Sequence, residues 1–150
     1  MRVAICRLMT APRAPVLLYD GECGLCNGVV RLMLRHDAGG RIRFAPLQSP
    51  PGQDFLRSQG LPTGSFDSLV FVPDWGNQVS GGFQLRTGGA LAAFAELDGP
   101  WRAVSWLRIV PVFLRDPVYR LISRTRAALF GRYKPGPLAD PAWEKRFLAR

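Results

Sequence analysis

Two cysteines separated by two residues lie between an apolar run and a helix-like run. Cys23 and Cys26 follow the apolar residues 16–19 and precede the helix-like residues 28–36. Side chains at positions i and i+3 share one face of a helical turn, so the two sulfurs can come close enough to form a disulfide. The free amide N–H groups of a first helical turn also stabilise a thiolate on Cys23. A strand that ends in C-x-x-C and continues into a helix is therefore typical of a redox dithiol.

The length and composition of the chain predict one folded domain. A chain of 150 residues can bury a core of its own, and 47% hydrophobic with 21% charged residues excludes an intrinsically disordered protein. No apolar run approaches the roughly 18 residues that a membrane-spanning helix needs. Residues 1–14 contain arginines but neither the apolar segment nor the cleavage site of a signal peptide, so we expect a loose N-terminal tail there.

Cysteine usage favours a reducing compartment. Besides the motif, the chain has one more cysteine, Cys6, in the N-terminal tail. A total of three cysteines is too few for the disulfide scaffold of a small secreted domain. We therefore expect the protein to be cytoplasmic.

The pattern of apolar residues predicts an α/β domain over residues 15–100. Strands are expected at residues 16–19, 41–45, 68–72 and 78–85, and helices at residues 27–36, 53–59 and 88–97. Thr87 is expected to cap the last of these helices. Crossover helices should join parallel strands, and a turn at residues 74–77 should join the last two strands as a hairpin. This order predicts a thioredoxin-like three-layer α/β fold with a helical C-terminal extension.

The positive charge of the chain is concentrated in its C-terminal third. Residues 1–100 carry 9 basic and 8 acidic side chains, whereas residues 101–150 carry 11 basic and 3 acidic side chains. We expect residues 101–134 to form a basic helical extension packed on the same domain, and residues 135–150 to form a C-terminal tail. The basic face can be a solvated surface on helices that cover the sheet, or it can dock on anionic lipid, nucleic acid or an acidic partner. Both interpretations stay open, although no motif for specific nucleic-acid binding is visible.

Two helices are expected in this extension, at residues 101–110 and 117–130. Each begins near a proline, and the second is expected to be capped by Asp116 and ended by Gly131. The second helix carries one apolar stripe of Val118, Leu121, Ile122, Thr125 and Leu129, with Arg120, Arg124 and Arg126 off it. The aromatic residues Trp101, Trp106 and Phe113 fit core packing better than a stacking platform for bases.

The motif and three further stretches resemble the DCC family of thiol-disulfide oxidoreductases. Asp20, Cys23 and Cys26 match its D-x-x-C-x-x-C pattern. Residues 43–49, 68–70 and 111–131 are similar to the family's second strand, central strand and C-terminal helical block, so the resemblance covers residues 15–134. It implies protein-disulfide reductase or related exchange activity.

The sequence departs from the family pattern at two places. Thr87 stands where a serine is typical of the family, which keeps a hydroxyl group. No cysteine follows Gly131 and Arg132, where many members carry one. A role for a third thiol in that region is therefore excluded.

The spacing of the dithiol assigns a different role to each cysteine. Cys23 is expected to be the nucleophile, because it lies at the start of the helix and should be more exposed than Cys26. Cys26 is expected to be the resolving thiol, which releases the substrate from a mixed disulfide. Glu22 is adjacent and acidic, so we expect weaker thiolate stabilisation than in strongly oxidising enzymes.

Asp20 has two compatible roles. A partly buried carboxylate three residues before Cys23 can accept or donate the proton during exchange. An aspartate at this place can also cap the helix. The residues alone do not decide between the two roles.

Two other functions remain as alternatives. C-x-x-C is half of many zinc sites, but only Cys6 and His36 remain as further soft ligands, and His36 is expected on the solvent side of its helix. The motif could also be kept for structure in a non-catalytic scaffold that binds a partner. Our main expectation is dithiol–disulfide exchange with no bound cofactor or metal, acting on a disulfide-containing protein or a small thiol and supplied by an unidentified reductant.

Overall fold

Residues 14–64, 69–76, 82–130 and 141–148 are described in a computed structural model of this chain. The predictions for Cys6, for Gly131 as a helix end and for the side chain of Arg126 lie outside the described residues, as do parts of the last two expected strands.

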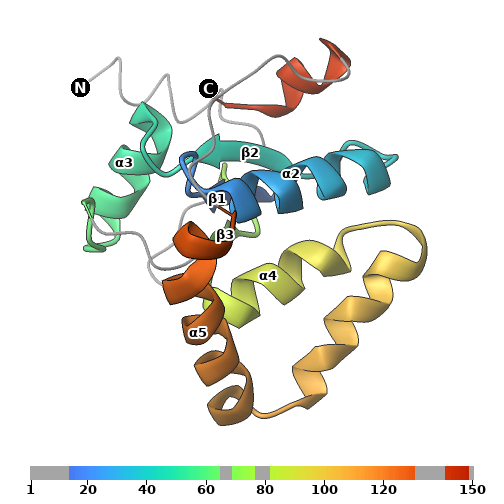
Figure 1. The fold of residues 1–150 in the computed structure, drawn as a ribbon. Helices are drawn as coiled ribbons and strands as arrows, with labels where there is room; N and C mark the ends of the chain where they lie inside the picture. Colours follow the sequence, from blue (N-terminus) through green and yellow to red (C-terminus); the bar gives the residue numbers. More distant parts are fainter. Residues whose placement is uncertain (1–13, 65–68, 77–81, 131–140, 149–150) are drawn as a thin grey trace.

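A four-stranded sheet lies at the centre of the described residues (Figure 1). Its strands are β1 (Val16–Tyr19), β2 (Arg43–Pro46), β3 (Val70–Val72) and β4 (Gln84–Leu85), in the order β2-β1-β3-β4. β1 runs parallel to β2, and β3 runs antiparallel to both of its neighbours. The apolar run that precedes the C-x-x-C motif is therefore an interior strand, which fixes the place from which the motif emerges.

Helices cover both faces of this sheet. α2 (Gly24–His36) and α4 (Arg86–Ala95) pack on one face, in an apolar cluster that includes Leu17 of β1. α3 (Pro50–Ser58) packs on the other face, in a second cluster that includes Leu18. Alternate residues of one strand enter the two clusters, as the pleat of a strand requires. The strand order and the layers confirm the predicted thioredoxin-like three-layer α/β fold.

The helices that pack on the sheet each begin two or three residues earlier than expected, α3 at Pro50 where residue 53 was expected. α2 starts at Gly24, because Cys23 occupies its N-cap position. α4 starts directly after Leu85, which makes no side-chain cap bond. The prediction that Thr87 caps this helix is wrong, because its hydroxyl group donates a 2.6 Å hydrogen bond to Asp116 instead.

The C-terminal third contributes a 3₁₀ helix and a long α-helix. η1 (Gly99–Ile109) packs on α4, and α5 (Val112–Phe130) packs on α2 and α4. α5 runs through Pro117 instead of beginning there, and Asp116 therefore lies inside the helix and does not cap it. Within the described parts of the chain, no helix combines the length and apolar content that crossing a bilayer requires.

The apolar stripe of α5 faces away from the core. Tyr119 lies on the half-buried side of the helix, and its hydroxyl oxygen accepts a 3.0 Å hydrogen bond from the N–H of Leu69, next to β3. This bond and the bond between Thr87 and Asp116 hold the polar side of α5 inward. The stripe residues Val118, Leu121, Ile122 and Leu129 are consequently exposed.

The aromatic residues of the C-terminal third differ in burial. Trp101 packs against the core cluster, with its ring centroid 5.4 Å from that of His36 and 6.3 Å from that of Phe94. Trp106 and Phe113 are 74% and 73% exposed, so the prediction that they pack in the core is wrong. Both exposed aromatic residues lie near the connection between η1 and α5.

The segment expected to form a C-terminal tail packs beside the sheet over residues 141–148. It contains the 3₁₀ helix η2 (Pro141–Arg146) and then continues along β2. Phe147 forms an isolated parallel bridge with Phe44, and the N–H of Leu148 donates a 2.9 Å hydrogen bond to the carbonyl oxygen of Phe44. Apolar side chains of this segment extend both clusters.

A buried ion pair ties this segment to the end of α2. The fully buried carboxylate of Asp37 lies 2.5 Å from Nη2 of Arg146 and accepts a 2.8 Å hydrogen bond from the N–H of Ile42. Burial lowers the pKa of Arg146, and the negative charge of Asp37 opposes this shift. Asp37 therefore supplies the negative charge that compensates the buried guanidinium group of Arg146.

Loss of Asp37 is expected to destabilise the whole fold. Asp37→Ala should lower the free energy of unfolding by about 3–5 kcal/mol, because it leaves the buried charge of Arg146 without compensation. Asp54→Ala removes the partner of Arg57 in an exposed ion pair and should change the value by less than about 1 kcal/mol. Denaturant unfolding followed by circular dichroism measures the free energy of unfolding of both variants and of the wild type. Equal losses in the two variants would contradict the role of the buried pair.

Candidate active site

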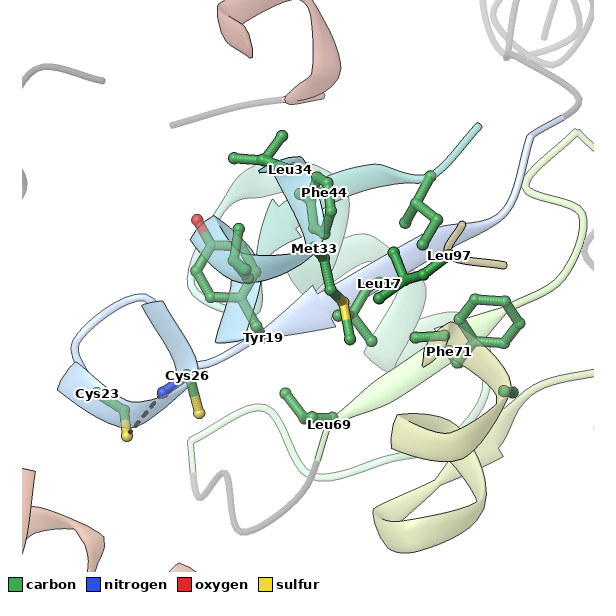
Figure 2. Close-up of a cluster of buried hydrophobic side chains, with 14 residues drawn as sticks. Leu17, Tyr19, Cys23, Cys26, Met33, Leu34, Phe44, Leu69, Phe71 and Leu97 are labelled. Carbon is green, nitrogen blue, oxygen red and sulfur yellow. Dashed lines mark hydrogen bonds between the residues drawn. The ribbon is translucent and has the colours of Figure 1, made fainter. Parts of the chain in front are cut away.

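The two cysteines lie at the junction between β1 and α2. Cys23 is the N-cap residue in extended conformation (φ −91°, ψ 124°), and Cys26 lies in the first turn of the helix. The Sγ atom of Cys23 accepts a 3.5 Å hydrogen bond from the N–H of Cys26. The two cysteines lie 3.6 Å apart and are not joined by a disulfide, and their sulfurs project to the same side of the helix start (Figure 2). An intramolecular disulfide is therefore within reach of a small movement.

Both cysteines are buried. Cys23 is 5% exposed and Cys26 is 7% exposed, so the prediction that Cys23 is the more exposed of the two is wrong. Because Cys23 turns its sulfur back toward the helix, both residues join the apolar cluster that contains Tyr19 and Leu69 (Figure 2). Only a small part of either cysteine is therefore open to the sulfur of a substrate.

Asp20 organises the turn before the helix and does not cap it. Its Oδ1 atom accepts a 3.0 Å hydrogen bond from the N–H of Glu22 and a 2.8 Å hydrogen bond from Nε2 of Gln48. Its carbonyl oxygen accepts a 3.2 Å bond from the N–H of Cys23. The cap position belongs to Cys23, so the capping role expected for Asp20 is wrong. The structure places its half-buried carboxylate in the turn that presents the dithiol.

Gln48 clamps this turn from the loop between β2 and α3. Its side-chain amide donates to Asp20, and its Oε1 atom accepts a 3.1 Å hydrogen bond from the N–H of Gly21. Gly21 is closely approached, since a Cβ atom there would lie 3.1 Å from Cβ of Pro46 and 3.3 Å from Oε1 of Gln48. Sequence reasoning assigned no role to Gln48, although it lies in one of the stretches that resembled the family.

Asn27 is a second residue that sequence reasoning missed. Its buried side-chain amide donates hydrogen bonds to the carbonyl oxygens of Gly21 at 3.0 Å and of Cys23 at 2.8 Å. These bonds join the turn to the body of α2. The signal in the sequence was a polar residue of low helix propensity directly after Cys26, on a helix face that is otherwise apolar.

The described residues do not form a metal site. Among them, no group of three or more His, Cys, Asp or Glu side chains is placed to hold one. His36, expected on the solvent side, is half-buried and contacts the ring of Trp101. Cys6 lies outside the described residues.

Comparison with known proteins places this geometry in a family. Residues 17–132 match the model of the DCC1-like thiol-disulfide oxidoreductase family. The chain belongs to this family. The match covers the motif, the sheet and α5, and it confirms the resemblance seen in the sequence.

Two curated relatives agree with the family assignment. The uncharacterized protein YuxK of Bacillus subtilis (strain 168) is 41% identical over 142 residues, which cover 93% of this chain and 99% of that protein. A chloroplastic DCC family protein of Arabidopsis thaliana is 32% identical over 120 residues, which cover 80% of this chain and 67% of that protein. No solved structure gives a significant match.

Removal of the Asn27 amide is expected to loosen the junction. Asn27→Ala should lower the free energy of unfolding by about 1–3 kcal/mol, because a buried carbonyl group loses its donor. It should also make Cys23 react faster with a thiol-modifying reagent. Ser58→Ala removes an exposed hydroxyl group that bonds to Phe55 and is the control, with little change in either property. Unchanged thiol reactivity in Asn27→Ala would mean that the amide does not hold the turn.

Proposed function

We propose that this protein catalyses thiol–disulfide exchange with Cys23 as the nucleophile and Cys26 as the resolving thiol. The observation that supports the proposal most strongly is the unbridged cysteine pair at the start of α2, whose two residues lie 3.6 Å apart. The substrate is a disulfide in another protein or in a small molecule. Membership of the thiol-disulfide oxidoreductase family supports the same reaction class.

The first step is an exchange between Cys23 and the substrate disulfide. The thiolate of Cys23 attacks one sulfur of the substrate, the substrate S–S bond breaks, and a mixed disulfide forms. The other substrate sulfur leaves as a thiolate and takes up a proton. The N–H of Cys26 points at the Sγ atom of Cys23 and stabilises negative charge there before the attack.

The second step closes the disulfide within the protein. The thiolate of Cys26 attacks the Sγ atom of Cys23, the mixed disulfide breaks, and the second substrate sulfur leaves and is protonated. The substrate has then gained two electrons and two protons, and the protein dithiol has become a disulfide. A separate dithiol reductant must return the protein to its starting state.

Asp20 is proposed to move the proton between Cys26 and solvent. Gln48 and the turn hold its carboxylate immediately before the dithiol, as a general acid–base group requires. No other acidic side chain lies within the motif except Glu22, which is exposed. Asp20 is therefore the residue of the turn best placed to exchange a proton near the buried thiols.

One observation favours a second candidate function. Both cysteines are largely closed to solvent, as structural cysteines usually are. A non-catalytic scaffold that binds a partner would keep the pair for packing alone. The two functions differ in whether Cys23 can form a covalent link to a substrate.

Trapping of the mixed disulfide separates these functions. Cys26→Ser should accumulate a covalent complex with a disulfide substrate, because no thiol remains to resolve it, whereas Cys23→Ser should form none. Both variants also carry Cys6→Ser, so that the cysteine outside the motif cannot form a disulfide with the substrate. Non-reducing electrophoresis and mass spectrometry of the linked peptide measure the outcome. If neither variant forms a complex, the scaffold is the better description.

The role of Asp20 is tested by an isosteric change. Asp20→Asn keeps an oxygen that can accept the bonds from Gln48 and Glu22, but it cannot take up a proton at neutral pH. The rate of disulfide reduction should fall by about 10²-fold or more if the carboxylate transfers the proton. Wild-type activity in Asp20→Asn combined with loss of activity in Asp20→Ala would assign the carboxylate to the turn alone.

A further inference from the structure

We infer that the outer face of η1 and α5 docks on an anionic lipid bilayer surface. This inference does not depend on the exchange reaction proposed above. It begins with an apolar surface, here called the η1–α5 surface, that the described residues leave uncovered. Its exposed members are Trp106, Leu107, Ile109, Val112, Phe113, Leu114, Val118, Leu121, Ile122 and Leu129.

The surface has two continuous parts. The first is the tip where η1 turns into α5, which lies far from the sheet (Figure 1). Ile109 is 86% exposed there, beside the exposed Trp106 and Phe113. The second part is the stripe along α5, where residues recur at helical spacing from Leu114 to Leu129. A monomeric soluble protein rarely leaves so many large apolar side chains together in water.

Hydroxyl groups in this region do not interrupt its apolar character. The hydroxyl of Thr125 donates to the carbonyl oxygens of Leu121 at 2.8 Å and of Ile122 at 3.4 Å, one turn earlier in the same helix. The hydroxyl of Ser105 likewise donates to the carbonyl oxygen of Arg102. Both groups are satisfied within their own helices, so they need no hydrogen bond from a partner. This face is therefore compatible with the hydrocarbon region of a bilayer, which offers no hydrogen-bonding groups.

The charged side chains of η1 and α5 that the structure shows exposed are all positive. Arg102, Arg108, Arg120 and Arg124 are exposed, and the structure gives none of them an acidic partner among the described residues. The one acidic side chain of residues 99–130, Asp116, is bonded to Thr87 on the inner side of α5. This distribution matches an amphipathic helix that lies in the interface of an anionic membrane, with tryptophan, phenylalanine and leucine among arginines.

Charge decides between a bilayer and a second copy of this chain. Pairing two copies through this face would bring two sets of uncompensated arginines together, and such pairing is unfavourable. Lipid phosphates supply the missing negative charge, while the long arginine side chains let the apolar tip enter the acyl region. α5 has 19 residues and a length of about 28 Å, and it would lie along the bilayer surface.

Vesicle binding by the full chain tests this docking. The protein should sediment with phosphatidylcholine vesicles that contain phosphatidylglycerol, much less with pure phosphatidylcholine, and binding should fall at high salt. Tryptophan fluorescence should shift to the blue on binding, and Trp106→Phe should remove most of the shift, because the other tryptophans are buried or half-buried. Absence of binding to anionic vesicles at low salt would overturn the inference.

Paired variants separate the apolar and the charged contributions. Ile109→Ser with Phe113→Ser should weaken vesicle binding about tenfold or more, because both side chains are exposed and contribute buried apolar area only when docked. Arg120→Gln with Arg124→Gln should weaken it by about 25-fold, since each arginine near an anionic surface strengthens binding about fivefold. Arg35→Gln with Arg57→Gln removes the same net charge on other helices and is the control, with a smaller loss.

Two outcomes would assign the surface to another occupant. Light scattering that shows a dimer in solution, converted to monomer by the Ile109→Ser and Phe113→Ser variant, would make the surface an interface between copies. Vesicle binding that responds to the arginines but not to the apolar substitutions would indicate charge attraction without insertion and would also overturn the inference. The Cys23→Ser variant should bind vesicles as the wild type does, so failure of the exchange proposal leaves this test intact.

Discussion

The hydrogen bond from the N–H of Cys26 to the sulfur of Cys23 connects the fold to its chemistry. The same sulfur that caps α2 is the atom proposed to attack a substrate. A helix start needs an acceptor at this position, and an acceptor that carries negative charge fits it best. Whatever fixes the start of α2 therefore also fixes the position and electrostatic surroundings of the reactive atom. β1 contributes to this, because it is an interior strand and cannot shift without breaking the sheet.

The polar residues around the junction hold it from three directions. Asp20 closes the turn from within, Gln48 reaches it from the loop after β2, and Asn27 binds it from the helix. None of these bonds uses a cysteine sulfur, so the turn can keep its shape while the sulfurs change partners. Burial of the dithiol limits the approach of a substrate, because only a small part of Cys23 is exposed. Hydrogen bonds thus fix the turn before the helix, and burial limits how much of the dithiol is open to a substrate.

Sequence patterns predicted the elements that carry a strong local signal. The apolar strand before the motif, the helix after it and the thioredoxin-like order follow from alternation and helical periodicity, which act over a few residues. The contact between Gln48 and Asp20 joins residues 28 positions apart, and the ion pair between Asp37 and Arg146 joins residues 109 positions apart. No local pattern contains such contacts, so the clamp on the turn and the packed C-terminal segment were found only in the structure.

The stripe on α5 shows a different limit. Periodicity identified correctly which side chains share a face of this helix, but it cannot say whether that face turns inward or outward. Tyr119 and Asp116 decide the matter, because their hydrogen bonds to Leu69 and Thr87 fix the opposite face against the domain. The helix therefore has an inner face that packs near the start of β3 and an outer face that is apolar and flanked by arginines. Docking through the outer face would leave those inner bonds in place, so the surroundings of the dithiol should be the same in the free and in the bound protein. Binding to lipid and exchange at the dithiol are consequently separable properties of one helix and its neighbours.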